Sequence, residues 1–219
     1  LSSLDKFKLF STTSSDQEVL SVTANSNAAT GSFEIDVSRL AQRHKLGSTE
    51  HLNDATFAQA LTIEVGGKSL TVNAAGDSLT LDEIRDLINE SENNPGVTAS
   101  VLNVGDDKQR LVLTAEDEGF ENSITLSGGL ETAIGLGTIN RNAADEMISN
   151  LQDLDAEFFV DNYKVNTPGN NVSSVIEGLD FQLMAVGVST ATVNRDASGV
   201  ASNVQKLADD SGAIKTAGL

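Results

Sequence analysis

The sequence predicts an α+β fold that is mostly β: two strand-rich domains, the outer inserted into the inner, flanked by stubs of a helical stalk. Three observations lead to this fold class. Apolar and polar residues alternate with a period of two through most of the middle of the chain, which is typical of half-buried strands. The apolar residues are mainly Val, Leu, Ile and Ala, with aromatic residues at only 4%, which suits many short strands. Helical spacing is found mainly at the two ends.

The two ends of the chain predict helices. Leu1, Leu4 and Phe7 fall on one helical face near the start. Near the end, the residues at helical spacing are Val200, Val204, Leu207 and Ile214. We expect residues 1–10 and 197–219 to be stubs of a helical stalk, with frayed termini as the alternative. The chain begins with neither Met nor a secretory signal, so we also expect it to be a piece of a longer protein.

A first group of strands precedes the central segment of the chain. Phe33, Ile35 and Val37 alternate with polar residues, which predicts a half-buried strand. Residues 18–23 are its expected partner strand, with residues 25–31 as the polar turn between them.

A second group of strands follows the central segment. Residues 158–165 alternate around a turn at Asp161-Asn162. Residues 172–176 have the spacing of a single helical turn, and residues 179–193 alternate again. We expect the two groups to share one sheet and to form the inner domain.

The central segment predicts an outer domain inserted between the two strand groups. Residues 61–72 alternate around Gly66-Gly67, which is a strong hairpin signal. Thr80 and Glu83 have the spacing of a capping box, so a helix is expected to begin there.

Shorter strands follow that helix, which gives the order β-β-α-β-β-β between residues 56 and 126. Asp106-Asp107 supplies one of the turns between these strands. Residues 130–149 are rich in Gly and Asn, and we expect them to be a mobile exit from the domain.

Charge and composition exclude several classes of function. The 14 basic and 32 acidic residues give a net charge of −18, which repels phosphate backbones and anionic lipids, so we expect no nucleic-acid binding and no electrostatic docking to membranes. The absence of Cys excludes disulfides, thiolate catalysis, iron–sulfur clusters and Cys-based zinc sites. No apolar run reaches the roughly 18 residues that a spanning helix needs, so we expect no membrane insertion.

No group of residues predicts catalysis. His44 and His51 are expected at the surface, with no third metal ligand nearby. Asp153, Asp155 and Glu157 alternate and could converge on one strand face, but the spacing of a calcium-binding loop is missing. The remaining candidates are expected in turns and loops: Asp106-Asp107, Glu116-Asp117-Glu118, Gly128-Gly129, Gly135 and Gly137. We therefore predict no catalytic, cofactor-binding or metal-binding residues.

Three segments, in this order, resemble the head of the flagellar hook-associated protein 2 family of filament cap proteins. Residues 31–44 (GSFEIDVSRLAQRH) resemble the opening of that head. The second segment looks like the inserted motif that axial flagellar proteins share, and it reads LTLDEIRDLIN at 79–89, GVTASV at 96–101 and RLVLT at 110–114. The third resembles a later part of the head, and it reads DAEFFVDN at 155–162, NNV at 170–172 and VIEGLDFQL at 175–183. The family usually has Asp-Gly where Asp161-Asn162 stands, and Asn also accepts left-handed backbone angles.

The resemblance implies a structural protein rather than an enzyme. Such proteins form a homo-oligomeric cap on the growing filament, beneath which flagellin subunits fold and insert. The implied partners are further copies of the chain, flagellin, hook–filament junction proteins and an export chaperone, with a host surface receptor if the exposed domain is an adhesin. The implied location is extracellular, at the flagellum tip, after export by the flagellar type III system. The resemblance also implies the domain bounds. The inner domain, residues 11–51 and 153–196, would be the second domain of the family, the inserted outer domain, residues 55–149, would be the third, and the terminal stubs would belong to the first.

Two other functions stay open. Another axial flagellar component or a secreted adhesin module could also carry the inserted motif, but the segments at 31–44 and 155–183 favour the cap. An acidic secreted hydrolase is the alternative from another class, and a rise in thermal stability on adding calcium or zinc would favour it. Because a cap must move as the filament grows, its contacts should be modest, and we expect this chain alone to be monomeric or weakly associated.

Overall fold

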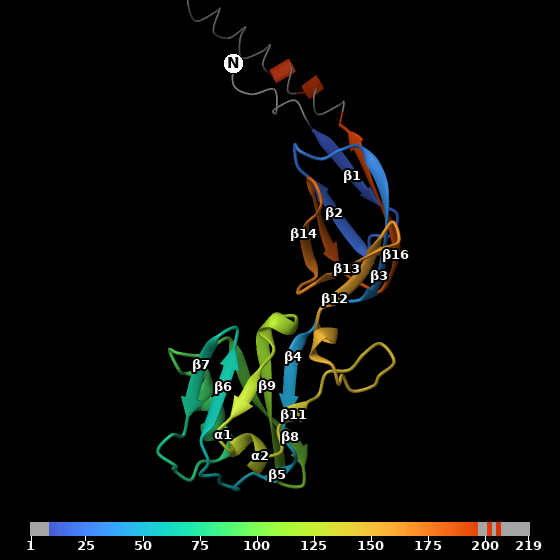
Figure 1. Cartoon of the computed structure of the whole chain (residues 1–219). Coiled ribbons are helices and arrows are strands. Elements are labelled where there is room, and N and C mark those ends of the chain that lie inside the picture. The colour runs from blue at the N-terminus through green and yellow to red at the C-terminus, as the bar shows by residue number, and fades with distance from the viewer. Residues whose placement is uncertain (1–8, 197–200, 203–204, 207–219) are drawn as a thin grey trace, which may run out of the picture. The chain divides into compact units, whose positions relative to one another are not determined.

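The computed structural model describes residues 9–196, 201–202 and 205–206, and it divides the chain into two compact units (Figure 1). Unit 1 comprises residues 1–38, 157–165 and 170–219, and unit 2 comprises residues 39–156 and 166–169. Strands predominate and the helices are short, so the predicted mostly-β α+β class is confirmed.

Unit 1 is built from two sheets. One has the strand order β1-β16-β3-β12-β13 and the other has the order β14-β15-β2. Side chains alternate between buried and exposed, as in β2, where Leu20 and Val22 are buried, and in β3, where Ile35 and Val37 are buried. These buried faces form the core of the unit. The strands are β1 (Phe10–Ser14), β2 (Leu20–Ala24), β3 (Gly31–Arg39), β12 (Ala156–Val160), β13 (Tyr163–Thr167), β14 (Asn171–Ile176), β15 (Leu179–Leu183) and β16 (Gly187–Arg195).

The two predicted strand groups contribute to both sheets of unit 1, rather than to the one sheet that was expected. The turn at Asp161-Asn162 is confirmed, and both residues have positive φ angles of 47° and 68°, as a tight hairpin turn requires.

The predicted pairing of β2 with β3 is wrong. β2 instead pairs antiparallel with β15, with Leu20 opposite Leu183 and Ala24 opposite Leu179. The polar connection after β2 turns away from β3, because the Asn25 side chain accepts a hydrogen bond from the Asn27 amide (2.9 Å) and the Asn25 amide donates to the Gly178 carbonyl (2.9 Å). Such a long polar connection lets the chain change sheets, which a two-residue hairpin turn would prevent.

The predicted helical turn at residues 172–176 is also wrong, because these residues form the strand β14. The register of β14 against β15 shifts between Ser173 and Ile176, and Ser174 has a φ of 69°. Such a bulge breaks the alternation of side chains. The broken alternation gave Val172, Val175 and Ile176 an apparent helical spacing.

Unit 2 contains two further sheets and a helix. One sheet has the order β11-β4-β9-β5, with β8 also paired to β9, and the other has the order β10-β6-β7. The predicted order β-β-α-β-β-β is confirmed by β6 to β10 with α1 among them. The elements are β4 (Arg43–Gly47), β5 (His51–Leu52), β6 (Leu61–Val65), β7 (Lys68–Val72), α1 (Leu81–Asn89), β8 (Val97–Gly105), β9 (Lys108–Glu118), β10 (Thr125–Ser127), α2 (Leu130–Ala133) and β11 (Gly137–Thr138), with short 3-10 helices at Phe120–Asn122 and Leu151–Leu154.

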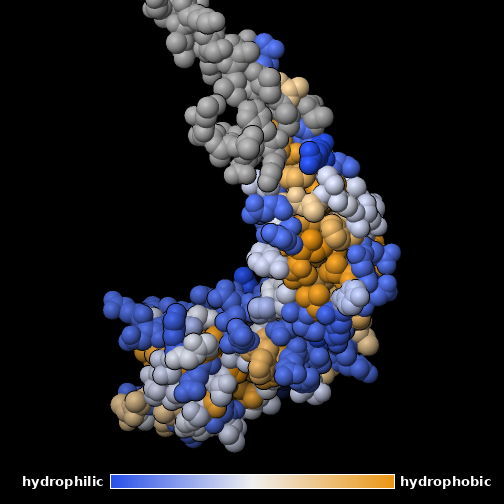
Figure 2. Space-filling view, turned by 45° about the horizontal axis from the view of Figure 1, so that its top comes forward, coloured by the Kyte–Doolittle hydropathy of each residue, from blue (hydrophilic) through white to orange (hydrophobic). Residues whose placement is uncertain are grey.

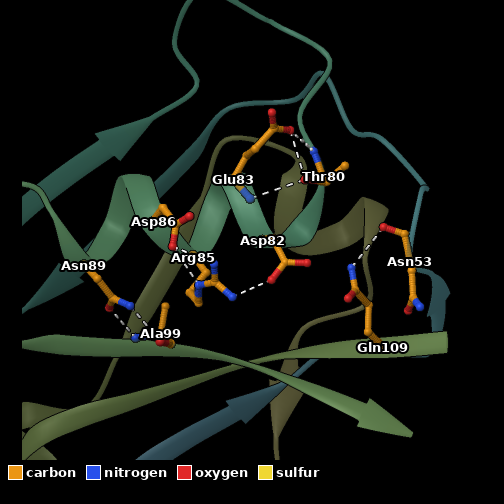
Figure 3. A network of polar contacts seen from close by, with 9 residues as sticks. All are labelled: Asn53, Thr80, Asp82, Glu83, Arg85, Asp86, Asn89, Ala99 and Gln109. Atoms are coloured by element: carbon orange, nitrogen blue, oxygen red, sulfur yellow. Dashed lines mark hydrogen bonds and ion pairs between the residues drawn. The ribbon is translucent and has the colours of Figure 1, made fainter. Parts of the chain in front are cut away.

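The helix α1 begins at the predicted capping box (Figure 3). The Glu83 amide donates to the Thr80 hydroxyl (3.3 Å), and the Thr80 amide donates to the Glu83 carboxylate (2.8 Å). At the other end, Asn89 bonds both the amide and the carbonyl of Ala99 in β8 (2.8 Å each). This side chain therefore takes the place of a neighbouring strand at the edge of β8.

Two expectations about the boundaries of unit 2 are corrected by the structure. Residues 39–51, which we assigned to the inner domain, lie in unit 2, because β4 and β5 both pair with β9. Residues 130–149 are an integrated part of this unit rather than a loose exit: α2 and β11 lie there, and Leu130, Ile134, Asn140 and Ile148 are buried.

The predicted helical stubs lie largely outside the described residues. Phe10 already belongs to β1 rather than to a helix. In the second stub, residues 201–202 and 205–206 are described, and they are helical.

Candidate interaction surface

His44 is buried, which contradicts the prediction that it lies at the surface. Its Nδ1 accepts a hydrogen bond from the Ile124 amide (2.9 Å), so the proton of the neutral ring is on Nε2, which donates to the Thr138 hydroxyl (3.0 Å). Burial lowers the pKa of His44 below its usual value of 6.5. The side chain thus joins β4 to β11 and to the residue before β10, and it has a structural role.

His51 is only half-buried, in β5, and its Nε2 lies 3.1 Å from both the Thr49 hydroxyl and the Ile134 carbonyl. Its ring meets Phe57 edge-on at 5.0 Å between centroids. In the part of the chain that the structure describes, no three His, Asp or Glu side chains are grouped so that they could hold a metal ion.

The alternating carboxylates near residue 155 do not converge. Asp153 pairs with Arg39 (3.3 Å), and Asp155 accepts a hydrogen bond from the Phe120 amide (2.7 Å). Glu157, in β12, pairs with Lys164 (2.7 Å). Each carboxylate therefore serves a local contact of its own.

The glycine pair Gly128-Gly129 lies in a turn, as expected, and a short helix follows it. That helix, α2, spans only Leu130–Ala133. The Glu131 carboxylate already accepts the Gly129 amide (2.8 Å) at the start of this helix, and a Cβ on Gly128 would lie 2.6 Å from the Ala60 carbonyl oxygen. Gly128 thus allows a close approach to Ala60, the residue before the strand β6.

The outer face of the β4-β9-β8 sheet in unit 2 combines basic and apolar side chains. Register places Lys108 opposite Leu52, Arg110 opposite Leu102, and Lys45 opposite Thr114, all on the face away from the buried Leu111 and Leu113. Ile139 lies on the same face, because a Cβ on Gly47 would meet its Cγ2 at 3.0 Å. We call this surface the basic face; its residues are Lys45, Leu52, Leu102, Lys108, Arg110 and Ile139.

The basic face exposes large apolar side chains. Leu52 is 55% exposed, Leu102 is 51% exposed and Ile139 is 40% exposed. The sequence contains one signal for this exposed apolar surface. The apolar residues Val101, Leu102 and Val104 break the alternation and place apolar side chains on both faces of β8. In the space-filling view, hydrophobic residues form a broad patch on unit 1 and smaller ones on unit 2, within a largely hydrophilic exterior (Figure 2).

The outer face of the larger sheet in unit 1 is acidic and apolar. Asp36 lies opposite Val188, which is 54% exposed, and Glu34 lies opposite Thr190. A hollow of about 340 Å³ on the other sheet is lined by Ser21, Thr23, Asn171, Val172, Ser173, Asp180, Phe181 and Gln182. A smaller one, of about 180 Å³, is lined by Glu34, Asp36, Phe159 and Asn162. We call the surface made by Glu34, Asp36, Phe159 and Val188 the acidic face.

No helix in the described residues is both long enough and apolar enough to cross a membrane. The surfaces that remain are broad sheet faces with charged and apolar side chains, which are suited to contacts with other polypeptides.

Comparison with known proteins agrees with the resemblance. A family model described as the flagellar hook-associated protein 2 N-terminus matches residues 1–44, and one described as the flagellin hook IN motif matches residues 60–117. The A-type flagellar hook-associated protein 2 of Pseudomonas aeruginosa is 30% identical over 95% of this chain and 48% of its own length. The flagellar hook-associated protein 2 of Escherichia coli strain K12 is 32% identical over 79% of this chain and 38% of its own length.

A solved structure resembles almost the whole chain. The flagellar cap protein FliD of Escherichia coli, in a crystal structure of its D1-D2-D3 domains, matches with a TM-score of 0.74 at 27% identity, over 99% of this chain and 75% of that one. The chain spans about half or less of the length of the two curated relatives described above. The matched segments, the curated relatives and this structural similarity all agree, and the chain therefore belongs to the flagellar hook-associated protein 2 family.

Proposed function

We propose that the whole protein forms the cap at the distal end of the bacterial flagellar filament. In this role it assembles as a homo-oligomeric ring and promotes the folding and insertion of flagellin during filament growth. The observation that carries the proposal is the similarity to the Escherichia coli flagellar cap protein over 99% of this chain. The match of residues 1–44 to the hook-associated protein 2 N-terminus favours the cap over other axial components, which share only the inserted motif.

The proposed role needs no catalysis. It is performed by surfaces, and the sheet faces of both units, with exposed side chains such as Leu52 and Val188, are the parts of the described chain that suit it. We assign unit 1 to the second domain of the family and unit 2 to the third. The boundary between them then falls between residues 38 and 39 rather than after residue 51.

The proposed location is extracellular, at the flagellum tip, and the proposed route is the flagellar type III export system with its chaperone. A chain without Cys is indifferent to the change of redox conditions on this route. The proposed partners at the tip are flagellin and the hook–filament junction proteins. Adhesion to a host surface receptor is a second proposed role, in which the apolar side chains exposed on unit 2 would be the contact.

Deletion of the gene tests the cap role directly. We expect the deletion strain to secrete monomeric flagellin without building filaments, and we expect a plasmid copy of the full-length gene to restore filaments and swimming. Normal filaments and motility in the deletion strain would refute the role. Loss of binding to host cells with filaments intact would instead support the adhesin.

A further inference from the structure

The free edge of the strand β7 in unit 2 presents unpaired backbone groups. β7 lies at the end of the sheet β10-β6-β7 and, in the part of the chain that the structure describes, it pairs only with β6. The two-residue turn at Gly66-Gly67 makes Val65 and Lys68 a hydrogen-bonded pair, and such pairs alternate along an antiparallel ladder. The amides and carbonyls of Ser69 and Thr71 therefore point away from β6.

The side chains of Thr62 and Thr71 support this alternation. Their hydroxyls are hydrogen-bonded to one another (2.8 Å) across the β6–β7 ladder, and opposite side chains come closest at the pairs that share no backbone hydrogen bond. Among the described residues, the outward amides and carbonyls of Ser69 and Thr71 have no hydrogen-bond partner. Unpaired edge groups of this kind are a template for a further strand.

The helix α1 closes one strand edge and leaves another open. Its residue Asn89 bonds the amide and the carbonyl of Ala99, and so closes that part of the edge of β8 (Figure 3). On the side of β7, a hollow of about 430 Å³ lies between residues 70–73 and the end of α1, where Leu87, Glu90 and Ser91 line it. We call this hollow the β7–α1 groove.

The β7–α1 groove combines apolar surface with negative charge. Leu87 is 45% exposed. Glu90 is the C-cap of α1, it is exposed, and its carboxylate has no ion-pair partner among the described residues. The last turn of α1 contains no basic residue, so the negative end of the helix dipole adds to the charge of Glu90. An occupant of this groove therefore needs free backbone amides and carbonyls, an apolar side chain and a positive charge.

We propose that the β7–α1 groove binds an extended, still unfolded segment of flagellin as an added strand. This site rests on the proposed cap function, in which flagellin reaches the protein before it has folded. A segment that has not yet folded has its own amides and carbonyls free to pair with those of Ser69 and Thr71. It packs an apolar side chain on Leu87 and places a Lys or Arg beside Glu90. Folding releases the segment, because its backbone groups then pair within flagellin.

Hydrogen exchange followed by NMR tests the added strand, with the peptide TKTVTKT as the probe. In an extended strand this peptide presents Val and both Lys side chains on one face. If the Kd is about 0.1 mM, peptide at about 1 mM should slow the exchange of the Ser69 and Thr71 amides about tenfold. The amides of Leu70 and Val72 already point to β6, so their exchange should not change.

Peptides that together cover the flagellin of the same organism test the identity of the partner. They are fixed on an array and probed with the labelled chain. We expect the chain to bind those peptides in which apolar and basic residues alternate. Binding to none of the flagellin peptides would overturn the proposal.

Thr71→Pro and Thr71→Val form a matched pair of variants. Pro is tolerated at a free strand edge, but it removes the outward amide, so we expect loss of peptide binding with an unchanged circular dichroism spectrum. Thr71→Val keeps the amide and should bind the peptide as the wild type does. Glu90→Gln should weaken the binding of TKTVTKT about twofold to fivefold, because one exposed ion pair is lost.

A change in the probe tests the same contact with the protein unaltered. The peptide TKTVTKT with every backbone amide N-methylated cannot donate to the Ser69 and Thr71 carbonyls, and it should not bind. Unchanged exchange of the Ser69 and Thr71 amides with TKTVTKT, equal binding by Thr71→Pro, or equal binding of the methylated peptide would each overturn the added strand. A cap that holds flagellin elsewhere would still be missing from the deletion strain, so the two proposals fail separately.

Discussion

Gly119 provides a sharp test of the packing within unit 2. Its backbone, with φ 89° and ψ 169°, lies in a region that residues with a side chain avoid. A Cβ placed on it would lie 2.3 Å from the Pro168 carbonyl oxygen, 2.8 Å from the Pro168 Cα and 2.9 Å from the Asp155 carboxylate. Gly119→Ala would therefore force the connection at residues 166–169 away from this site.

Gly119→Ala should lower the free energy of unfolding in two ways. Backbone strain should lower it by about 1–3 kcal/mol, and overpacking against a fixed neighbour should lower it by about a further 1–3 kcal/mol. We therefore expect a loss of about 2–6 kcal/mol in the free energy of unfolding. Gly67→Ala is the matched control, because Gly67 also has a positive φ (79°) but no atom lies within 4 Å of its Cβ position, and a loss of about 1 kcal/mol is expected there.

Urea unfolding followed by far-ultraviolet circular dichroism measures both losses. Both variants pay a backbone cost, so the larger loss in Gly119→Ala reports the contact with Pro168 together with the more restricted backbone conformation of Gly119. Equal losses in Gly119→Ala and Gly67→Ala would refute the close approach of residues 166–169 to Gly119.

Three further predictions follow from single contacts. Phe158 is fully buried (0% exposed), so Phe158→Ala should cost about 3–5 kcal/mol in urea unfolding, and a loss below about 1 kcal/mol would contradict the assigned core of unit 1. Burial lowers the pKa of His44 below 6.5, so the contribution of the neutral ring to stability should be complete above pH 6.5 and should be lost as the pH falls from 6.5 towards the pKa of His44 in the folded protein. In this pH range the free energy of unfolding of His44→Gln should therefore depend less on pH than that of the wild type. An unchanged dependence on pH would argue against the buried ring. Thr80→Ala should lower the free energy of unfolding by about 1 kcal/mol. Because Thr80 lowers the pKa of Glu83 through its amide and its hydroxyl, loss of the hydroxyl should also raise the Glu83 pKa in an NMR titration. Thr80→Ser should preserve the stability and the lowered pKa.

Local signals predicted the local elements of the fold correctly. Gly66-Gly67 gave the β6–β7 hairpin because positive φ angles at both residues match the twist of the two strands. The Thr80–Glu83 spacing gave the start of α1 because the capping box is made by residues three apart.

Partners distant in sequence were beyond such signals. β2 alternates equally well whether it pairs with β3 or with β15, so its own residues do not select the sheet. In β14 the bulge at Ser174 changed the period itself, and the apparent helical spacing was its consequence.

The same limit applied to the candidate site. His44 stands among polar residues in the sequence, and only the fold brings Ile124 and Thr138 to its ring. The charges of Lys45 and Arg110 are visible in the sequence, but their common face depends on how β4 and β8 register against β9. Membership of the family, in contrast, was predictable, because the matched segments lie in order along the chain.

The position of the protein on the cell tests the central claim most directly. The 219 residues contain no Cys. In a full-length protein whose remaining residues are kept or made free of Cys, Lys68→Cys therefore provides a unique, exposed site for a maleimide dye on living cells. The account predicts one fluorescent spot at the distal end of each filament, and no labelling in the parent strain without the introduced cysteine. Label spread along the filaments, or confined to the cell body, would contradict a cap.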